Sequence, residues 1–238
     1  MIPVDLHCHS HFSPCGLHSI LELLTQAKTL GMAGLAITDH GPALGGRLNS
    51  SFFDRLYNPV PGIRMLKGCE SNILDETGAI DFPESLLKYT DILLAGFHVN
   101  FGQGRAKSFY TDIHARMLAL NPAVDIISHP TEAGFLPDFR ELARIARHAG
   151  VALEINNSKL MYDGMDPSIM EDLIRACRDE GCRIAVNSDT HAIGELGLDD
   201  LVLPLLARHG FPPELVVNGT AERAFAFIEE RRKNKVTT

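Results

Sequence analysis

The sequence predicts an α/β protein in which one parallel β-sheet closes into a barrel. Three observations indicate this fold. Short apolar runs alternate with amphipathic stretches along the whole chain, which is typical of repeated βαβ units. Glycine follows several of the amphipathic stretches, where helices commonly end. Polar residues gather just after nearly every apolar run, and a barrel brings the carboxyl ends of all its strands to one mouth.

Seven short apolar runs are predicted to be strands. They cover residues 2–6, 34–38, 64–68, 92–95, 124–127, 152–155 and 184–186, and a weaker eighth candidate covers 215–217. Seven or eight strands also fit an open doubly wound sheet, in which ligands bind at a switch point between a few strands. The polar residues follow almost all of the strands, and this distribution favours the barrel.

The amphipathic stretches between these runs are predicted to be helices. They cover residues 17–30, 109–120, 138–149, 168–180, 198–208 and 221–231. Glycines that can adopt a left-handed cap follow four of them, at Gly31, Gly150, Gly181 and Gly210. Three histidines, His114, His148 and His209, lie within or at the ends of these helices and are assigned no function.

The composition predicts one globular domain over residues 1–238. Hydrophobic residues make up 45% of the chain and charged residues 22%, as in ordinary globular proteins. No linker or composition shift divides the chain, and barrels of this length form single domains. No apolar run approaches the roughly 20 residues that cross a bilayer, so no membrane partner is expected.

The same features lead to expectations about location and partners. Residues 1–5 lack the start of a secretory signal, so a cytoplasmic location is expected. Five cysteines are an odd number and are expected to be reduced. A formal charge of −8 argues against a nucleic-acid partner, because phosphate backbones are bound by clustered Lys and Arg. A homo-oligomer is compatible with the sequence.

Side chains that can bind metal ions follow nearly every predicted strand. They are, in chain order, His7 and His9, Asp39 and His40, Glu70, His98, His129, and Asp189 with His191. A lone histidine beside a strand is more often a hydrogen-bonded structural residue than a ligand. Six of the eleven histidines lie at strand exits, however, and this joint placement predicts a metal site.

The spacing within these motifs also suits metal binding. His7 and His9 point to the same side of an extended strand, because successive residues alternate faces, and Cys8 then faces away. Asp189 and His191 have the same spacing. Imidazole and carboxylate together suit Zn, Mn or Fe better than Ca or Mg. The ligands outnumber the three or four that hold one zinc ion, so we expect two or three divalent ions that share bridging carboxylates.

Seven segments resemble successive motifs of one known family. They are VDLHCHSHFSP, AITDHG, GCESNI, AGFHV, IISHP, LEINNS and NSDTH. This ordered set is similar to the PHP (polymerase and histidinol phosphatase) family, most closely to its YcdX-type stand-alone bacterial phosphatases. The resemblance covers nearly the whole chain and implies a distorted (β/α)₇ barrel with phosphoesterase activity and a trinuclear metal centre.

The resemblance also implies which residues bind each ion. His7 and His9 would hold the first ion, with Asp189 beside it. Glu70 would bridge this ion to a second. The remaining histidines would hold the other ions, namely His98 and His129 the second, and His40 and His191 the third.

The chain departs from the YcdX-type pattern in the loop after His9. Those proteins have a further histidine six residues after the second histidine of the HxH motif, where this chain has Cys15, with His18 three residues on. Three alternatives follow. Cys15 binds as a thiolate, which would shift the preference towards Zn; His18 reaches back to fill the position; or neither binds and the third ion is held weakly.

These features lead to a hypothesis of metal-dependent hydrolysis of a small phosphomonoester. A hydroxide bridging two ions would attack phosphorus, and Asp189, His191 or a metal-bound water would protonate the leaving group. Two alternatives are an amidohydrolase-like C–N hydrolase, although those enzymes usually use a lysine after strand four, where this chain has His98, and a non-catalytic regulatory barrel. Histidinol phosphate, a nucleotide and a sugar phosphate are all compatible substrates.

Several further residues are candidates for supporting roles. Asp5 and Asp39 are candidate hydrogen-bond acceptors for the metal-binding histidines. Asn156 and Asn157 could line the mouth or cap the following helix. The cations that could contact a substrate phosphate are Arg47, Arg105 and Lys107.

Overall fold

The computed structural model describes residues 1–98, 101–162 and 165–235. Its centre is a sheet of seven parallel strands that follow one another in chain order, β1 to β7, and form a nearly closed barrel. The strands are β1 (Val4–Asp5), β2 (Gly34–Ile37), β3 (Arg64–Asn72), β4 (Ile92–Gly96), β5 (Ile126–Ile127), β6 (Ala152–Asn156) and β7 (Ile184–Asn187). The seven strands predicted from the apolar runs are confirmed, and so is the barrel.

The first and last strands meet at the mouth of the barrel. Cys8, just after β1, forms an isolated parallel bridge with Thr190, just after β7. The His9 amide donates a hydrogen bond of 2.8 Å to the Thr190 carbonyl. This contact brings the HxH motif after the first strand beside the DxH motif after the last strand.

Asn218 joins the same two strands deeper in the barrel. Its Oδ1 accepts a hydrogen bond from the Val186 amide at 2.9 Å, and its Nδ2 donates to the Val4 carbonyl at 3.0 Å. The eighth strand suggested at 215–217 is therefore wrong: the chain forms a 3₁₀ turn at Pro213–Leu215 and makes one parallel bridge, from Val216 to Ile184. A side-chain amide occupies the gap that another strand would fill.

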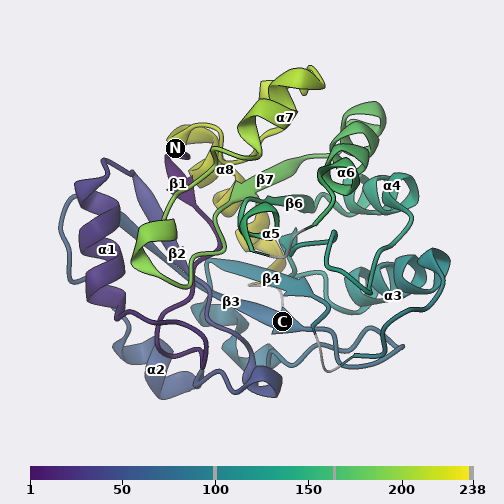
Figure 1. The fold of residues 1–238 in the computed structure, drawn as a ribbon. Coiled ribbons are helices and arrows are strands. Elements are labelled where there is room, and N and C mark those ends of the chain that lie inside the picture. Colours follow the sequence, from purple (N-terminus) through teal and green to yellow (C-terminus); the bar gives the residue numbers. More distant parts are fainter. Residues whose placement is uncertain (99–100, 163–164, 236–238) are drawn as a thin grey trace.

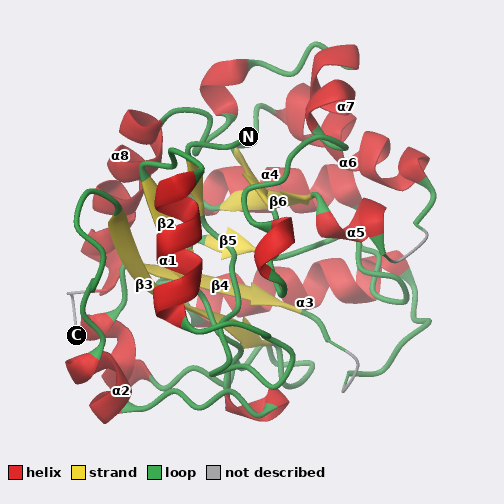
Figure 2. Cartoon of the chain, turned by 60° about the vertical axis from the view of Figure 1, so that its left-hand side comes forward, coloured by secondary structure: helices red, strands yellow, loops and turns green. Residues whose placement is uncertain are grey.

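Eight α-helices lie outside or across the ends of the sheet. They are α1 (Ile20–Thr29), α2 (Ser50–Arg55), α3 (Lys107–Leu120), α4 (Phe139–Ala149), α5 (Ser158–Met161), α6 (Pro167–Glu180), α7 (Leu203–Arg208) and α8 (Ala221–Arg232) among the described residues. Figure 1 shows α1 and α2 on one side of the strands and α3, α4 and α6 on the other. In Figure 2, α1 lies in front of the strands.

Local sequence signals fix where several helices begin and end. Ser19 and Glu22 form a capping box that starts α1 at Ile20, later than the predicted 17–30. The predicted helix 198–208 is also too long, because Pro204 lacks an N–H and is tolerated only in the first turn of α7. Gly150 and Gly181 cap α4 and α6 in the left-handed conformation, as predicted.

Alternate residues of the strands face two different apolar layers. In β4, Leu93 and Ala95 belong to the core cluster that contains side chains of α3, α4 and α6, whereas Ile92 and Leu94 belong to a cluster with Phe227 of α8. Because the two faces of the strands are covered by apolar side chains, the polar residues gather at the carboxyl ends of the strands. None of the helices in the described ranges combines the length and apolarity needed to cross a bilayer.

Candidate metal centre

The side chains that follow the strands converge at the mouth of the barrel. Glu70 is supplied by β3, and the others come from the turns after β1, β2, β4, β5 and β7. Almost all of them are buried, with relative exposures of 0% for His7 and His9, 1% for Glu70 and 4% for His129. So many buried ionisable side chains need groups of opposite charge, hydrogen bonds or bound ions around them. Burying a charge without such a partner costs several kcal/mol.

The first group consists of His7, His9 and Asp189. Their nearest ligand atoms lie within 4.8 Å of one another. His7 Nε2 and His9 Nε2 are 3.0 Å apart, and Asp189 Oδ1 is 3.4 and 3.3 Å from them. Asp189 adopts a left-handed backbone conformation, with φ of 54°. Such strain in a non-glycine residue concentrates at functional sites.

Glu70 lies at the middle of the centre, and its two oxygens face different histidines. Oε1 is 2.6 Å from His129 Nε2 and 3.3 Å from His98 Nε2, while Oε2 faces the histidines of the neighbouring loops. The distances from Oε2 are 3.3 Å to His7 Nε2, 3.4 Å to His9 Nε2 and 2.9 Å to His40 Nδ1. Burial opposes ionisation, but the surrounding histidines hold the pKa of Glu70 well below its ordinary value.

The second group consists of Glu70, His98 and His40, and His129 contacts the same Glu70 oxygen as His98. The rings of His98 and His129 contact edge to face, with centroids 5.1 Å apart. Burial lowers the pKa of His98, which favours the neutral imidazole that a metal ion requires. His129 also has a left-handed backbone, with φ of 26°.

The third group contains Cys15. Its sulfur lies with the ring nitrogens of His9, His40 and His191 in a set whose ligand atoms are all within 4.8 Å of one another. Burial would raise the pKa of the Cys15 thiol, but hydrogen bonds with His191 and His40 lower it to about 6. His18 is in none of these groups; its backbone carbonyl accepts a hydrogen bond from the His11 amide.

Several ligand atoms face one another without forming hydrogen bonds. Glu70 Oε2 and both ring nitrogens of His98 are buried and have no hydrogen-bond partner among the described residues. Buried polar atoms normally have one. Lone pairs that converge in this way fit cations, and the donor set of imidazole, carboxylate and thiolate fits divalent transition metals.

Glu154 is a residue of the centre that sequence reasoning missed. It lies within β6, is fully buried and accepts hydrogen bonds from His7 Nδ1 at 2.7 Å and from the His129 amide at 2.8 Å. The side-chain amides of Asn156 and Asn187 donate to the same carboxylate at 3.0 and 2.8 Å. An acidic residue inside the otherwise apolar run ALEI was the available signal.

The two aspartates proposed as acceptors act through backbone and serine groups. Asp39 accepts hydrogen bonds from the Ser10 and Ser13 hydroxyls, each at 2.7 Å, and the Ser13 oxygen lies 3.2 Å from His9 Nδ1. Asp5 accepts from the Ser188 hydroxyl and from the amides of His7 and Gly197. Asp39 therefore reaches the ring of the candidate ligand His9 through one serine, whereas Asp5 accepts hydrogen bonds from the backbone of the loops.

The two asparagines after β6 also stabilise the mouth. Asn156 Nδ2 donates to Asp189 Oδ2 at 3.1 Å. Asn157 Oδ1 accepts from the Leu201 and Val202 amides. Both side chains thus bind protein groups, and Asn157 makes no side-chain cap for α5.

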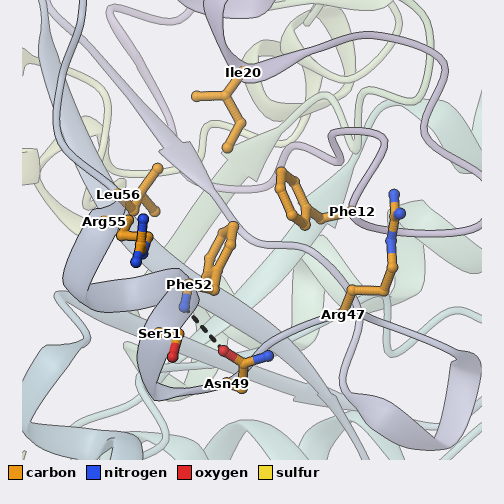
Figure 3. Close-up of a pocket in the computed structure, with 8 residues that line it drawn as sticks. All are labelled: Phe12, Ile20, Arg47, Asn49, Ser51, Phe52, Arg55 and Leu56. Carbon is orange, nitrogen blue, oxygen red and sulfur yellow. Dashed lines mark hydrogen bonds between the residues drawn. The ribbon is translucent and has the colours of Figure 1, made fainter.

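The candidate phosphate-binding cations are spread over the loops. Arg105 lies over the Phe109 ring, 5.6 Å from its centroid, and Lys107 is exposed at the start of α3. Arg47 donates to the His11 carbonyl and lies over the Phe12 ring. Figure 3 shows Arg47 and Phe12 in the wall of a cavity of about 460 Å³, with Phe52 facing Phe12. The lining contains none of the candidate metal ligands, so this cavity is separate from the metal centre.

Comparison with known proteins gives consistent results. The family model described as the PHP domain matches residues 5–158. A protein named "Probable phosphatase" from Caldicellulosiruptor bescii is 31% identical over 98% of both chains. "Probable phosphatase YcdX" of Escherichia coli is 33% identical, over 97% of this chain and 96% of its own.

A solved structure shares the fold. The histidinol phosphate phosphatase of Lactococcus lactis, solved in complex with zinc, L-histidinol and phosphate, superposes with a TM-score of 0.64. The match covers 88% of this chain and 94% of that one, at 18% identity. The barrel is therefore an architecture that occurs in other solved proteins of low sequence identity.

Proposed function

The chain belongs to the PHP domain family, and from this premise we propose that it is a metal-dependent phosphatase that hydrolyses small phosphomonoesters at a centre of three metal ions. Relatives of nearly the same length that are named probable phosphatases support the reaction class. The position of Glu70 carries the proposal. Its two oxygens face two different groups of histidines, as expected of a carboxylate shared by two ions.

Three sets of side chains would hold the ions. The first is His7, His9 and Asp189; the second is His98 and His129, with Glu70 between the two; and the third is Cys15, His40 and His191. Zn, Mn and Fe all suit this mixture of nitrogen, oxygen and sulfur ligands. When bound, such ions lower the pKa of water and stabilise the charge that develops on phosphoryl oxygens.

Asp189 and His191 are the candidates for proton transfer to the leaving group. Asp189 Oδ1 faces His7 and His9, and Oδ2 accepts a hydrogen bond from Asn156. Both oxygens of its carboxylate therefore already have partners. The His191 side chain is 32% exposed, against 7% for Asp189. His191 Nδ1 lies 2.8 Å from the Asp189 carbonyl, and its ring belongs to the third group. We therefore assign both residues to holding the ions and infer that the leaving group takes its proton from water.

The substrate class and location follow from the same features. The formal charge of −8 argues against a broad surface that binds a nucleic-acid backbone, which supports a small phosphate ester as substrate. All five cysteines are free, and Cys15 is exposed. An exposed reduced thiol is compatible with work in the cytoplasm.

Phosphate release tests the proposal. Protein of measured metal content would be assayed with p-nitrophenyl phosphate, histidinol phosphate, a nucleotide and a sugar phosphate. We expect release by the wild-type chain and a rate roughly a hundredfold lower for Glu70→Gln, which keeps the side-chain shape but removes the shared charge.

The exposed Glu84→Gln variant is the matched control and is expected to keep the wild-type rate. A full metal complement without phosphate release from any of these compounds would overturn the proposal. That result would instead favour a regulatory barrel that binds metal without turnover.

A further inference from the structure

Cys15 gives the third group a chemistry that the other two groups lack. Its sulfur lies among the nitrogens of His9, His40 and His191, and this group contains no carboxylate. The first group contains Asp189, and the second, which shares His40 with the third, contains Glu70. The centre therefore has one sulfur-containing site beside two sites built from nitrogen and oxygen.

The loop that carries Cys15 is held in place on both sides of the residue. The Ser13 hydroxyl and amide both donate to Asp39, and the Gly16 amide donates to the Ser13 carbonyl. The Leu17 amide donates to the carbonyl of His191 at 2.9 Å. The backbone at Cys15 is thus tied to the strand ends that supply the histidines, so the position of the sulfur is built into the fold.

Gly16 shows how closely this loop packs. A Cβ atom at this position would overlap the backbone carbonyl of Ser10. Only glycine lets the chain pass here, and the exposed Cys15 next to it places its sulfur beside the histidines. The other cysteines of the chain, Cys8, Cys69, Cys177 and Cys182, are buried.

His40 is shared between the second and third groups, because it also lies with Glu70 and His98 and its Nδ1 is 2.9 Å from Glu70 Oε2. His9 is common to the first and third groups, and its geometry decides between them. Its Nε2 lies 3.0 Å from His7 Nε2 and 3.3 Å from Asp189 Oδ1. We therefore count it with the first ion. Cys15, His40 and His191 then leave a fourth position of a tetrahedral ion open, as in catalytic zinc sites.

We propose that Cys15, His40 and His191 form a zinc-selective site within a centre whose other two sites accept manganese or iron as well as zinc. Thiolate ligands favour zinc over manganese, whereas carboxylate and imidazole ligands suit both. The inference rests on the proposed function in one respect, namely that the third group is part of the same metal centre. On this proposal, the single residue Cys15 makes the chain an enzyme that can hold zinc at one site and other metals at the other two.

The first experiment uses the wild-type protein alone. Metal-free protein would be given zinc or manganese, and the rate at which iodoacetamide alkylates Cys15 would be followed by mass spectrometry. The four buried cysteines are shielded in the folded protein, so the label reports on Cys15. We expect zinc to slow alkylation at least about tenfold and manganese to leave the rate nearly unchanged.

The second experiment compares Cys15→Ser and Cys15→His with the wild type. After loading with zinc in the presence of excess manganese, elemental analysis should show one zinc ion fewer per chain in Cys15→Ser. Cys15→His should keep an ion at this site but lose the preference for zinc. With cobalt, a thiolate-to-metal charge-transfer band should appear in the wild type and be absent from Cys15→His.

These readouts separate this inference from the proposed function. Equal alkylation rates with and without zinc, or no charge-transfer band in cobalt-loaded protein, would overturn the zinc site even if phosphate is released. Protection by zinc without any phosphatase activity would support the zinc site and count against the proposed reaction. Circular dichroism of each variant checks that the barrel is still folded.

Discussion

Four hydrogen-bond donors converge on the carboxylate of Glu154. Two come from the metal centre, the His7 ring and the His129 amide, and two come from asparagine side chains. A proton fixed on His7 Nδ1 leaves Nε2 free to bind an ion. Glu154 therefore positions a side chain proposed to bind the first ion and the backbone of one proposed to bind the second.

Glu154→Gln is expected to weaken metal binding by about 10- to 100-fold. The amide can present one oxygen, so its NH₂ group must face two of the four donors. Competition titration with a chelator measures the affinity of each ion, and Glu141→Gln on the exposed surface of α4 is the control. Unchanged affinities for the first two ions would show that the carboxylate has no positioning role.

His114 is a buried residue whose titration couples to stability. It lies in α3, its Nδ1 donates to the Tyr110 carbonyl, and its ring packs edge to face on Phe97. Burial lowers the pKa of His114 to about 4 from an ordinary 6.5. The folded state thus holds this imidazole neutral at pH values where the unfolded chain is protonated.

Stability is therefore expected to fall as the pH drops from about 6.5 to about 4, by about 3 kcal/mol from His114 alone. Above pH 6.5 both states are neutral and this contribution is constant. Urea unfolding of the wild type and of His114→Phe at pH 7.5 and 4.5 isolates the effect, since the metal-binding histidines titrate in both proteins. The variant should lose less stability on acidification; an equal loss in both proteins would contradict this account.

At the scale of elements, the buried side chain of Arg231 connects α8 to the sheet. Arg231 donates to Asp125 at 3.2 Å and to the backbone carbonyls of Pro122, Val124 and Ala149. Lys235, in the turn after α8, donates to the same aspartate at 2.5 Å. Two cations and one carboxylate, all buried, thus connect the last helix to the start of β5.

Replacing one member of this cluster should be costly. Arg231→Met is expected to lower the free energy of unfolding by about 3–5 kcal/mol, because it leaves buried carbonyls and part of the Asp125 charge unpaired. The neighbouring Arg232→Met is the matched control: that side chain is 46% exposed, and the loss should stay below about 1 kcal/mol. Similar urea midpoints for the two variants would rule out an anchoring role for Arg231.

The elements that sequence could predict are those with a strong internal signal. The runs of β2 and β4 and the caps of α4 and α6 are encoded locally, by buried apolar residues and by Asp138, Asp166 and the following glycines. The short helices α2 and α5 were not predicted, because four to six residues carry too little periodicity.

At the scale of the whole molecule, the barrel has seven strands because Asn218 completes the ring between β7 and β1. Its amide both accepts from and donates to the two strands, which no apolar side chain of that size can do. In the sequence, a single asparagine after a weak apolar run does not indicate that its side chain will connect two strands. The number of strands could therefore be predicted from family resemblance but not from periodicity.

Asn218→Ala should lower the free energy of unfolding by about 2–4 kcal/mol, since it leaves the buried Val186 amide and Val4 carbonyl without partners. Asn234→Ala is the comparison: that exposed side chain makes one hydrogen bond, to Pro122, and its loss should change stability by less than about 0.5 kcal/mol. Equal unfolding midpoints for the two variants in urea would mean that the ring closes without Asn218.

The convergence of the metal-binding residues could be predicted for the same global reason. Side chains that follow parallel strands must meet at one end of a barrel, so His7, Glu70 and Asp189 could be placed together without knowing any loop. The choice between Cys15 and His18 could not be made in this way. It depends on the path of the loop past Gly16, which only the packed structure defines.

The meeting of the segments after β1 and β7 at the mouth has a consequence for biosynthesis. The Leu6 amide bonds the Asn187 side chain across 181 positions of sequence, and the residues proposed to hold the first ion come from just after these two points. A nascent chain still on the ribosome carries the HxH pair from the start but lacks the opposing aspartate until its seventh strand emerges. The site proposed for that ion is therefore incomplete until residue 189 has been synthesised, and a translation product truncated before this point would carry the two histidines without the aspartate.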